Sequence, residues 1–172
     1  MNTFQKLIGH ASTVHKHRAM VRKLCFQCGL YWQGLTHDLS KYSPVEFWNG
    51  VKYYTGTASP HVGERKDKGY SDAWIHHHNR NKHHVEYWQD IDPTTGVSCP
   101  IEVPKKYVKE MICDRVAASM TYLGKQYHNR APLDYYEAHK YENRWHEKTR
   151  KMVEMYLKRI SECGFEEAMK WY

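Results

Sequence analysis

His37 and Asp38 are adjacent in the sequence, follow an apolar run and are followed one helical turn later by Lys41. Neighbouring side chains point apart on a regular helix, but at a helix end or a kink an imidazole and a carboxylate can both reach one metal ion. Such an ion polarises water or phosphate oxygens. The dipeptide is common, so its meaning depends on which other potential ligands the chain supplies.

Candidate ligands also lie on two predicted helices. His10 and His17 are seven residues apart on the apolar face of an N-terminal helix, where either could instead be a core histidine. Asp114 lies on the inward face of a later helix, and a carboxylate is costly to bury unless it is paired or bound to a metal. Pairing with Arg115 is the purely structural alternative.

A second group of histidines is dense, with five of them within nine residues. If one helix runs through this segment, His77 and His84 share its inner face. His76 and His83 form the competing pair, on an adjacent face with Arg80. A solvated polar helix end is the alternative for the whole group.

In chain order, an early helical histidine, the His-Asp pair and a later aspartate resemble the H…HD…D signature of the HD-domain superfamily of metal-dependent phosphohydrolases. The additional histidines resemble those of its two-metal members, in which the aspartate of the pair bridges the ions. The metal ligands that the resemblance implies are His17 (with His10 as the alternative), His37, Asp38, His77, His84 and Asp114. This chain differs in placing the extra histidines in one segment, which leaves the number of ions at one or two.

Two narrower resemblances are present. The sequence from His37 to Lys41 is similar to the HD-x-x-Lys motif of the two-iron branch of the superfamily, which includes myo-inositol oxygenase. The stretches HDLSKYSPVEF, GYSDAWIHHHNRNKHHVEYW and EMICDR resemble a bacterial and phage family known as a domain of unknown function. The second resemblance implies no activity.

The positions of the apolar residues predict an all-α fold, a single compact HD-like domain of about six to eight helices. No stretch shows the alternation of a strand. The predicted helices cover residues 3–28, 30–39, 44–53, 105–123 and 144–163, with others starting at Ser71 and Pro132; loops are expected over 54–70 and 90–103. The helix from Ser71 ends near Asn79 or continues to Trp88. The metal-site core covers about residues 10–125, and C-terminal helices over 132–171 pack on it.

Local signals and composition add further expectations. Ser43, Pro44 and Glu46 form a helix start, with the glutamate closing a capping box. The formal charge of +7 favours ligands that carry phosphate. The five cysteines indicate reduced thiols, with Cys25 and Cys28 packed in the core. With neither a membrane span nor a hydrophobic signal core, we expect a cytoplasmic protein.

The expected activity is hydrolysis of a phosphate ester in a nucleotide or another small molecule. One or two divalent transition-metal ions (Mn, Fe, Co, Ni or Zn) suit a mixed imidazole and carboxylate set. Asp38 and Lys41 are the predicted catalytic residues, and Lys41, Arg80 and Arg115 the predicted phosphate-binding residues. The alternatives are a di-iron oxygenase, suggested by Lys41, and a non-catalytic module that binds nucleic acid or protein.

Overall fold

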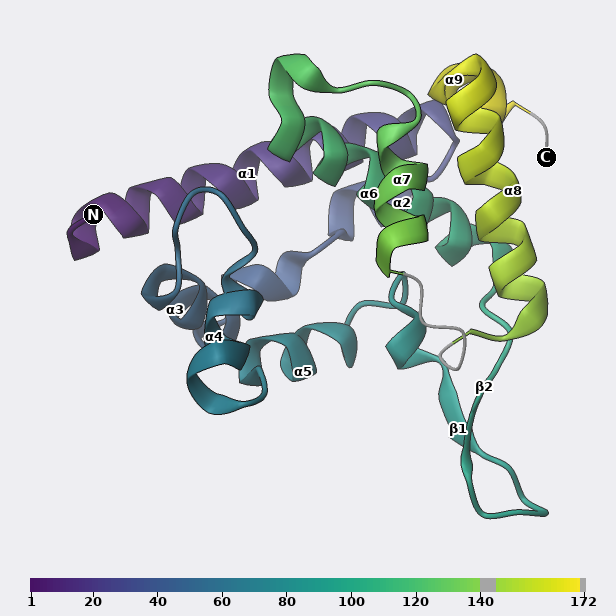
Figure 1. Ribbon diagram of the computed structural model, residues 1–172, viewed down its shortest axis with the longest axis horizontal. Helices are drawn as coiled ribbons and strands as arrows, with labels where there is room; N and C mark the ends of the chain where they lie inside the picture. Colours follow the sequence, from purple (N-terminus) through teal and green to yellow (C-terminus); the bar gives the residue numbers. More distant parts are fainter. Residues whose placement is uncertain (140–144, 171–172) are drawn as a thin grey trace.

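Helix α1, Thr3–Gln27, is the longest helix of the computed structural model, which describes residues 1–139 and 145–170 (Figure 1). Asn2 begins it, because the Asn2 side chain accepts a hydrogen bond from the backbone N–H of Gln5 at 2.9 Å and the Gln5 side chain bonds back to Asn2. The buried face of α1 contains the predicted apolar stripe, including both His10 and His17. The first helix of the sequence is therefore confirmed.

The described residues form nine α-helices, three 3₁₀ turns and one small hairpin. After α1 the elements are α2 (Tyr31–Thr36), η1 (Leu39–Tyr42), α3 (Pro44–Lys52), α4 (Pro60–Lys68), α5 (Asp72–His78), η2 (Val85–Tyr87), β1 (Gln89–Ile91), β2 (Ser98–Pro100), α6 (Lys105–Leu123), η3 (Gly124–Gln126), α7 (Ala131–His139), α8 (Glu147–Cys163) and α9 (Phe165–Met169). The all-α class is confirmed. The helices outnumber the expected six to eight because several, such as α2 and α9, are only one or two turns long. Within the described residues, no helix combines the length and apolar character that crossing a membrane requires.

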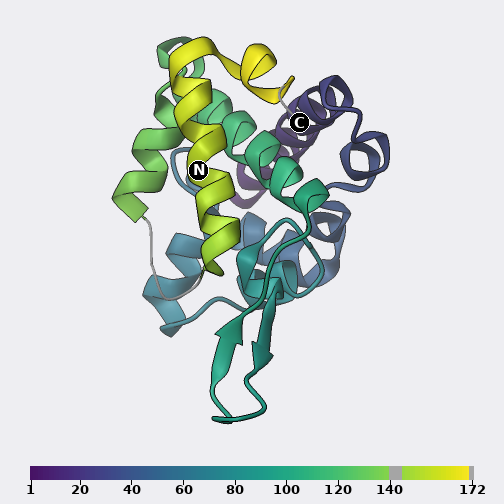
Figure 2. The ribbon, with the colours of Figure 1, turned by 90° about the vertical axis from the view of Figure 1, so that its right-hand side faces the viewer.

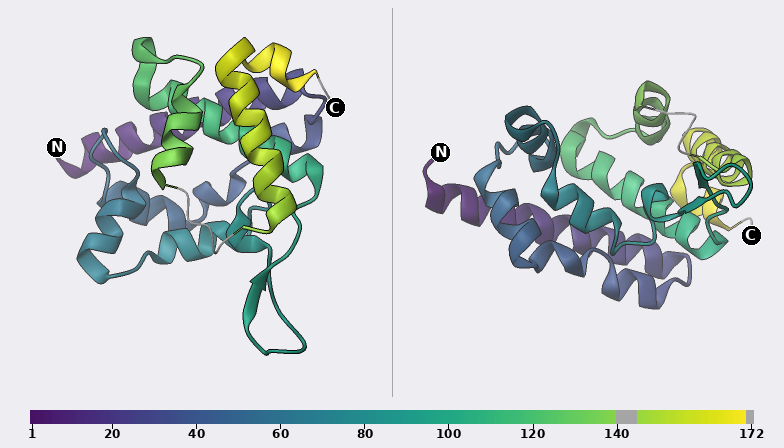
Figure 3. Two further views of the ribbon diagram at one scale, coloured as in Figure 1. Left: turned by 45° about the vertical axis from the view of Figure 1, so that its right-hand side comes forward. Right: turned by 90° about the horizontal axis from the view of Figure 1, so that it is seen from below.

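The apolar core lies between the C-terminal half of α1 and helices α6, α7, α8 and α9, and α6 lies alongside α1 (Figure 3). Ile112 and Val116 of α6 and Tyr156, Leu157 and Ile160 of α8 are fully buried in it. Helices α3, α4 and α5 pack against one another at the other end of α1 (Figure 1). The N-terminal residue of the predicted 144–163 helix and residue 171 lie outside the described residues.

The segment predicted as a loop over 54–70 contains helix α4, so that prediction was wrong. Pro60 occupies the first turn, and Gly69 ends the helix in the left-handed conformation at φ 81°. These are the start and stop signals of a short helix. They were interpreted as loop residues because so little apolar sequence lies between them.

The expected loop over 90–103 overlaps an antiparallel hairpin in which Gln89 pairs with Pro100 and Ile91 with Ser98. It projects away from the helices (Figure 2). Its strands have only three residues each, too few to show alternation in the sequence.

The histidine-rich segment is not one continuous helix. The Ser71 hydroxyl accepts a hydrogen bond from the N–H of Trp74, as predicted for an N-cap, but α5 ends at His78 with Asn79 as its C-cap. The chain then turns before η2. A helical projection through His84 therefore does not describe how these histidines are arranged.

Candidate metal centre

His37 and Asp38 occupy a sharp turn between α2 and η1. His37 is the C-cap of α2, and Asp38 adopts the left-handed conformation at φ 54°, as does no other non-glycine residue among those described. The Arg18 side chain holds the turn by donating from Nε to the His37 carbonyl oxygen at 2.8 Å. Both side chains are almost completely buried. The helix end that the pair requires in order to act together is thus present.

The carboxylate of Asp38 lies between two groups of potential ligands. Its Oδ2 is 3.5 Å from Nε2 of His37 and 3.9 Å from Nε2 of His17. Oδ1 of Asp114 is 3.0 Å from the same nitrogen of His17 and 3.6 Å from that of His37. His17, His37 and Asp114, the first group, come from α1, the turn and α6, yet one ligand atom from each lies within 4.8 Å of the others. The two histidines of this group face Oδ2 of Asp38.

The other oxygen of Asp38 faces the second group, which consists of His77, His83 and His84. Oδ1 of Asp38 is 3.3 Å from Nε2 of His77 and 3.5 Å from Nε2 of His83. One ligand atom from each of these four residues lies within 4.8 Å of one from every other. The structure thus contains both histidines of the predicted pair, His77 and His84, and adds His83 of the competing pair, because the turn after α5 brings His83 beside His77.

Glu110 orients two of these histidines by contacting Nδ1, on the side of each ring opposite to Nε2. Its Oε1 lies 2.9 Å from Nδ1 of His37 and 3.2 Å from Nδ1 of His83. An imidazole that donates from Nδ1 to a carboxylate presents the Nε2 lone pair on its opposite side. His37, His83 and Glu110 could themselves group around an ion, but their separations are those of hydrogen bonds.

Glu46 has a similar role for the second group. Its Oε2 is 2.7 Å from Nδ1 of His77, and its Oε1 is 2.6 Å from Nδ1 of His76. The backbone N–H of Glu46 does bond to the Ser43 hydroxyl, so the predicted cap exists. The Glu46 side chain, however, contacts the histidines rather than closing a capping box. Sequence reasoning missed both glutamates as parts of the site.

Several atoms that point into the cluster have no hydrogen-bond partner among the described residues. They are Nε2 of His37, His83 and His84 and Oδ1 of Asp38, all buried. Nε2 of His17 faces Oδ1 of Asp114 at 3.0 Å. A buried polar atom without a partner is costly. A cation between the two groups would contact these atoms at once, so the residues fit one or two metal ions, and the mixed nitrogen and oxygen donors suit transition metals.

The charges of the cluster also favour a cation. Burial alone would raise the pKa of Asp38, but His37 and Lys41 hold it well below its usual value. Burial lowers the pKa of His37, whereas the carboxylates of Asp38 and Asp114 raise it more, to about 10. A proton on His37 therefore helps to balance the carboxylates when no metal is bound, and a metal that displaces this proton binds with proton release.

A cavity of about 220 Å³ opens over the two groups and reaches between α1, α3 and α6. Lys41 lines it, with Nζ 2.9 Å from Oδ2 of Asp38. Arg80 and Arg115 do not line this cavity. The guanidinium of Arg115 lies 5.7 Å from the ring centres of Tyr136 and Trp145, and burial lowers its pKa. Of the three predicted phosphate-binding residues, the structure places only Lys41 at the cluster.

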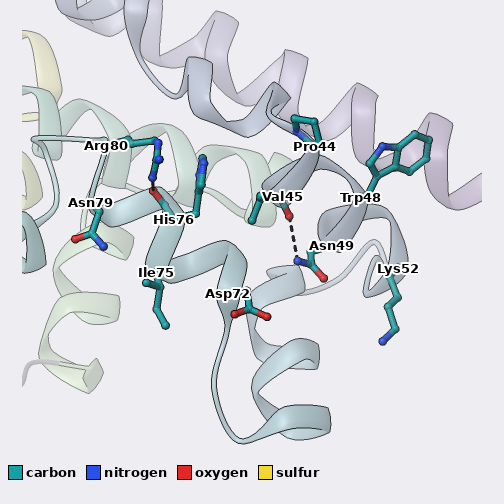
Figure 4. Close-up of a pocket in the computed structure, with 10 residues that line it drawn as sticks. All are labelled: Pro44, Val45, Trp48, Asn49, Lys52, Asp72, Ile75, His76, Asn79 and Arg80. Atoms are coloured by element: carbon teal, nitrogen blue, oxygen red, sulfur yellow. Dashed lines mark hydrogen bonds between the residues drawn. The ribbon is translucent and has the colours of Figure 1, made fainter.

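Arg80 lies in a separate surface groove of about 660 Å³ between α3 and α5, together with His76 and Trp48 (Figure 4). There Nη1 of Arg80 donates to the carbonyl oxygen of His76 at 3.3 Å. His76 therefore lies between the groove and Glu46, outside the ligand groups. His10, the alternative to His17, also belongs to none of these groups in the described chain; it packs against Phe47 on the cavity wall.

The fold and the site together define an all-α protein whose buried histidines and carboxylates could hold a metal. The chain belongs to a family of unknown function, DUF5662, whose model matches residues 6–159. Searches of curated proteins and of solved structures find no match. The matched region includes every candidate ligand.

Proposed function

We propose that the protein is a metal-dependent phosphohydrolase that acts on a small phosphate ester. One observation supports this most: Asp38 presents one carboxylate oxygen to each of two ligand groups whose inward-facing nitrogens are largely unpartnered. Asp38 would bridge two ions, with His17, His37 and Asp114 holding one and His77, His83 and His84 the other. The order of His17, His37-Asp38 and Asp114 resembles that of the HD-domain superfamily, to which we propose the family is related.

A bound divalent ion lowers the pKa of a coordinated water and polarises phosphate oxygens. The side chains of the protein supply positive charge beside the phosphate and hold the ligand rings in place. Lys41, held at the cavity by Asp38, offers positive charge to the phosphate as negative charge develops on its oxygens. Glu46 and Glu110 fix the rings of His77 and His37, which limits the reorganisation that the reaction requires.

The test combines elemental analysis with phosphate release. The protein is purified, stripped of metal and reconstituted separately with Mn, Fe, Co, Ni and Zn, and a panel of phosphate monoesters is assayed. We expect one or two ions per chain and phosphate release that Asp38→Asn abolishes. Folded protein that takes up no ion, or that takes up ions and releases no phosphate from any ester, would contradict the proposal.

A second candidate is an oxygenase with two iron ions, which the two ligand groups sharing Asp38 and the nearby Lys41 also support. It predicts oxygen consumption and a coloured oxidised iron form. Phosphate release by a colourless protein without oxygen would exclude it. All five cysteines are free, which supports the proposal that either enzyme works in the cytoplasm.

A further inference from the structure

Side-chain hydroxyl groups line the cavity over the metal-ligand cluster. Thr13 comes from α1, Tyr54 from the segment after α3, and Thr121 from the last turn of α6; Ser59 and Tyr122 also line it. These groups belong to neither ligand group. They are positioned to contact the part of a bound molecule that does not react.

The protons of three of these hydroxyls are already used by the protein. Oγ1 of Thr13 donates to the carbonyl oxygen of Gly9 at 2.9 Å, so its 3.1 Å contact with the hydroxyl of Tyr54 is a hydrogen bond that Tyr54 donates. Oγ1 of Thr121 donates to the carbonyl oxygen of Ala117 at 2.7 Å. Because a hydroxyl has one proton and two lone pairs, these oxygens can only accept from a ligand.

An ionised phosphate has no proton to donate, so this wall does not suit a phosphate group. Lys41, in contrast, is the single lysine or arginine among the described residues that line the cavity, and it lies at the cluster. The cavity therefore offers one phosphate site, beside Asp38. The oxygens of Thr13, Tyr54 and Thr121 can accept hydrogen bonds from a group that carries hydroxyl protons.

The size of the cavity and its tryptophan argue against a nucleobase. At about 220 Å³ the cavity is smaller than the roughly 300–1,000 Å³ of most ligand sites. The indole of Trp74 is already covered, with the Arg65 guanidinium 5.5 Å from its ring centre and the rings of His77 and His84 at 5.8 and 4.9 Å. These contacts leave less of the ring available for stacking on a base.

We propose, on the basis of the phosphohydrolase function above, that the substrate is the monophosphate of a small polyhydroxylated compound, a sugar or polyol phosphate. Its phosphate lies at Lys41 and the metal ligands, and its hydroxyls donate to Thr13, Tyr54 and Thr121. This assignment is narrower than a nucleotide or a general phosphate ester. It makes the hydroxyl groups of the substrate, rather than a ring system, the basis of specificity.

Equilibrium binding to the metal-loaded protein tests the assignment separately from catalysis. Hydrolysis-resistant phosphonate analogues of glycerol 3-phosphate and ribose 5-phosphate are compared with those of phenyl phosphate and adenosine monophosphate by calorimetry, and phosphate release from the phosphates themselves is followed in parallel. We expect the two polyol analogues to bind at least about 10-fold more tightly, because each hydrogen bond contributes roughly a factor of 3 to 10. Equal or tighter binding of the phenyl or adenosine analogue would overturn the assignment.

Substitutions test the residues. Thr121→Val and Tyr54→Phe remove a hydroxyl with little change of shape and should each reduce the preference for polyol phosphates about 3- to 10-fold, without affecting metal content or phenyl phosphate binding. Ser119→Ala is the matched control, because Ser119 donates to the carbonyl of Arg115 in the same helix but does not line the cavity. If both variants keep the wild-type preference, the assignment is wrong.

The two proposals fail in different ways. Suppose that polyol phosphates bind preferentially, that Thr121→Val reduces this preference, and that no compound releases phosphate. This result would support binding of substrate hydroxyls by the cavity and contradict the phosphohydrolase function. Phosphate release at rates that do not depend on the hydroxyl groups of the substrate would contradict the assignment of a polyol phosphate. It would not contradict the phosphohydrolase function.

Discussion

Oε1 of Glu110 lies 2.9 Å from Nδ1 of His37, which leaves the opposite nitrogen of the ring facing Asp38 and Asp114. The same oxygen contacts His83. A carboxylate one turn before Asp114 on α6 therefore controls a histidine in each ligand group, and the first prediction follows from this contact.

Glu110→Gln should weaken metal binding by about 10- to 100-fold while the protein stays folded, because the amide keeps the shape of the side chain and removes its charge. Metal affinity is measured by competition with a chromophoric chelator, and folding by circular dichroism. Glu102→Gln, at an exposed position paired with Lys148, is the control and should leave affinity unchanged. Equal affinity of the Glu110 variant and the wild type would show that Glu110 does not orient the ligands.

The charge of Asp38 and its left-handed backbone conformation can be tested with separate substitutions. Asp38→Asn should lose bound metal and activity but keep the fold, since asparagine tolerates the left-handed conformation. Asp38→Ala should also lose metal and be less stable than Asp38→Asn by roughly 1–2 kcal/mol. Elemental analysis and urea unfolding provide the measurements. Metal bound to Asp38→Asn at the wild-type stoichiometry would exclude Asp38 as a bridging ligand.

Metal binding should stabilise the folded protein. A free ion concentration of about 100 times the dissociation constant should raise the free energy of unfolding by about 2.7 kcal/mol, and a chelator should reverse this. Thermal unfolding is followed with and without the ion, and Asp38→Asn serves as the variant that should not respond. A wild-type melting temperature that does not depend on metal would argue against the site.

Lys41→Met should lower the rate of phosphate release by about 10²- to 10³-fold at unchanged metal content, because the positive charge nearest the proposed phosphate position is lost. Lys52→Met is the matched control, since Lys52 pairs with Asp67 at the surface and does not line the cavity. Steady-state kinetics with elemental analysis of each variant separates the two effects. Similar rates for both lysine variants would exclude the proposed role of Lys41.

Gly50 should be sensitive to a single added methyl group. A Cβ at this position would overlap the His10 ring at Nε2, so Gly50→Ala should destabilise the protein by about 1–3 kcal/mol. Removing the ring in the double variant with His10→Ala should recover part of this loss, and a double-mutant cycle of unfolding free energies measures the coupling. Simple additivity of the two changes would contradict the predicted contact.

The sequence predicted the all-α class and helices such as α1 and α6, because long apolar periodicities determine them. It also identified His37-Asp38, Asp114 and His17, which the structure brings together. Short elements were missed: α4 has almost no apolar face, and its limits are set by Pro60 and Gly69.

The second ligand group could be predicted only in part. His77 and His84 were identified, but His83 was assigned to a competing pair, because the turn after α5 depends on packing rather than on periodicity. Glu46 was interpreted as a capping residue, a local role that three-residue spacing alone suggests. Glu110 had one available signal, its position four residues before Asp114, which places both carboxylates on one face of α6.

The α1 residues in the apolar core, Val21, Leu24 and Cys25, all lie in the C-terminal half of that helix. No described residue of the N-terminal half belongs to this core; there Val14 is buried separately, and the His10 ring packs against Phe47 and Tyr54. An ion held at the centre would therefore act as a crosslink between α1, the turn at Asp38 and α6, and it would extend folding cooperativity to the part of the molecule that has little hydrophobic core. Amide hydrogen exchange in this half of α1 would then depend on metal, whereas exchange in α8 would depend mainly on the apolar core.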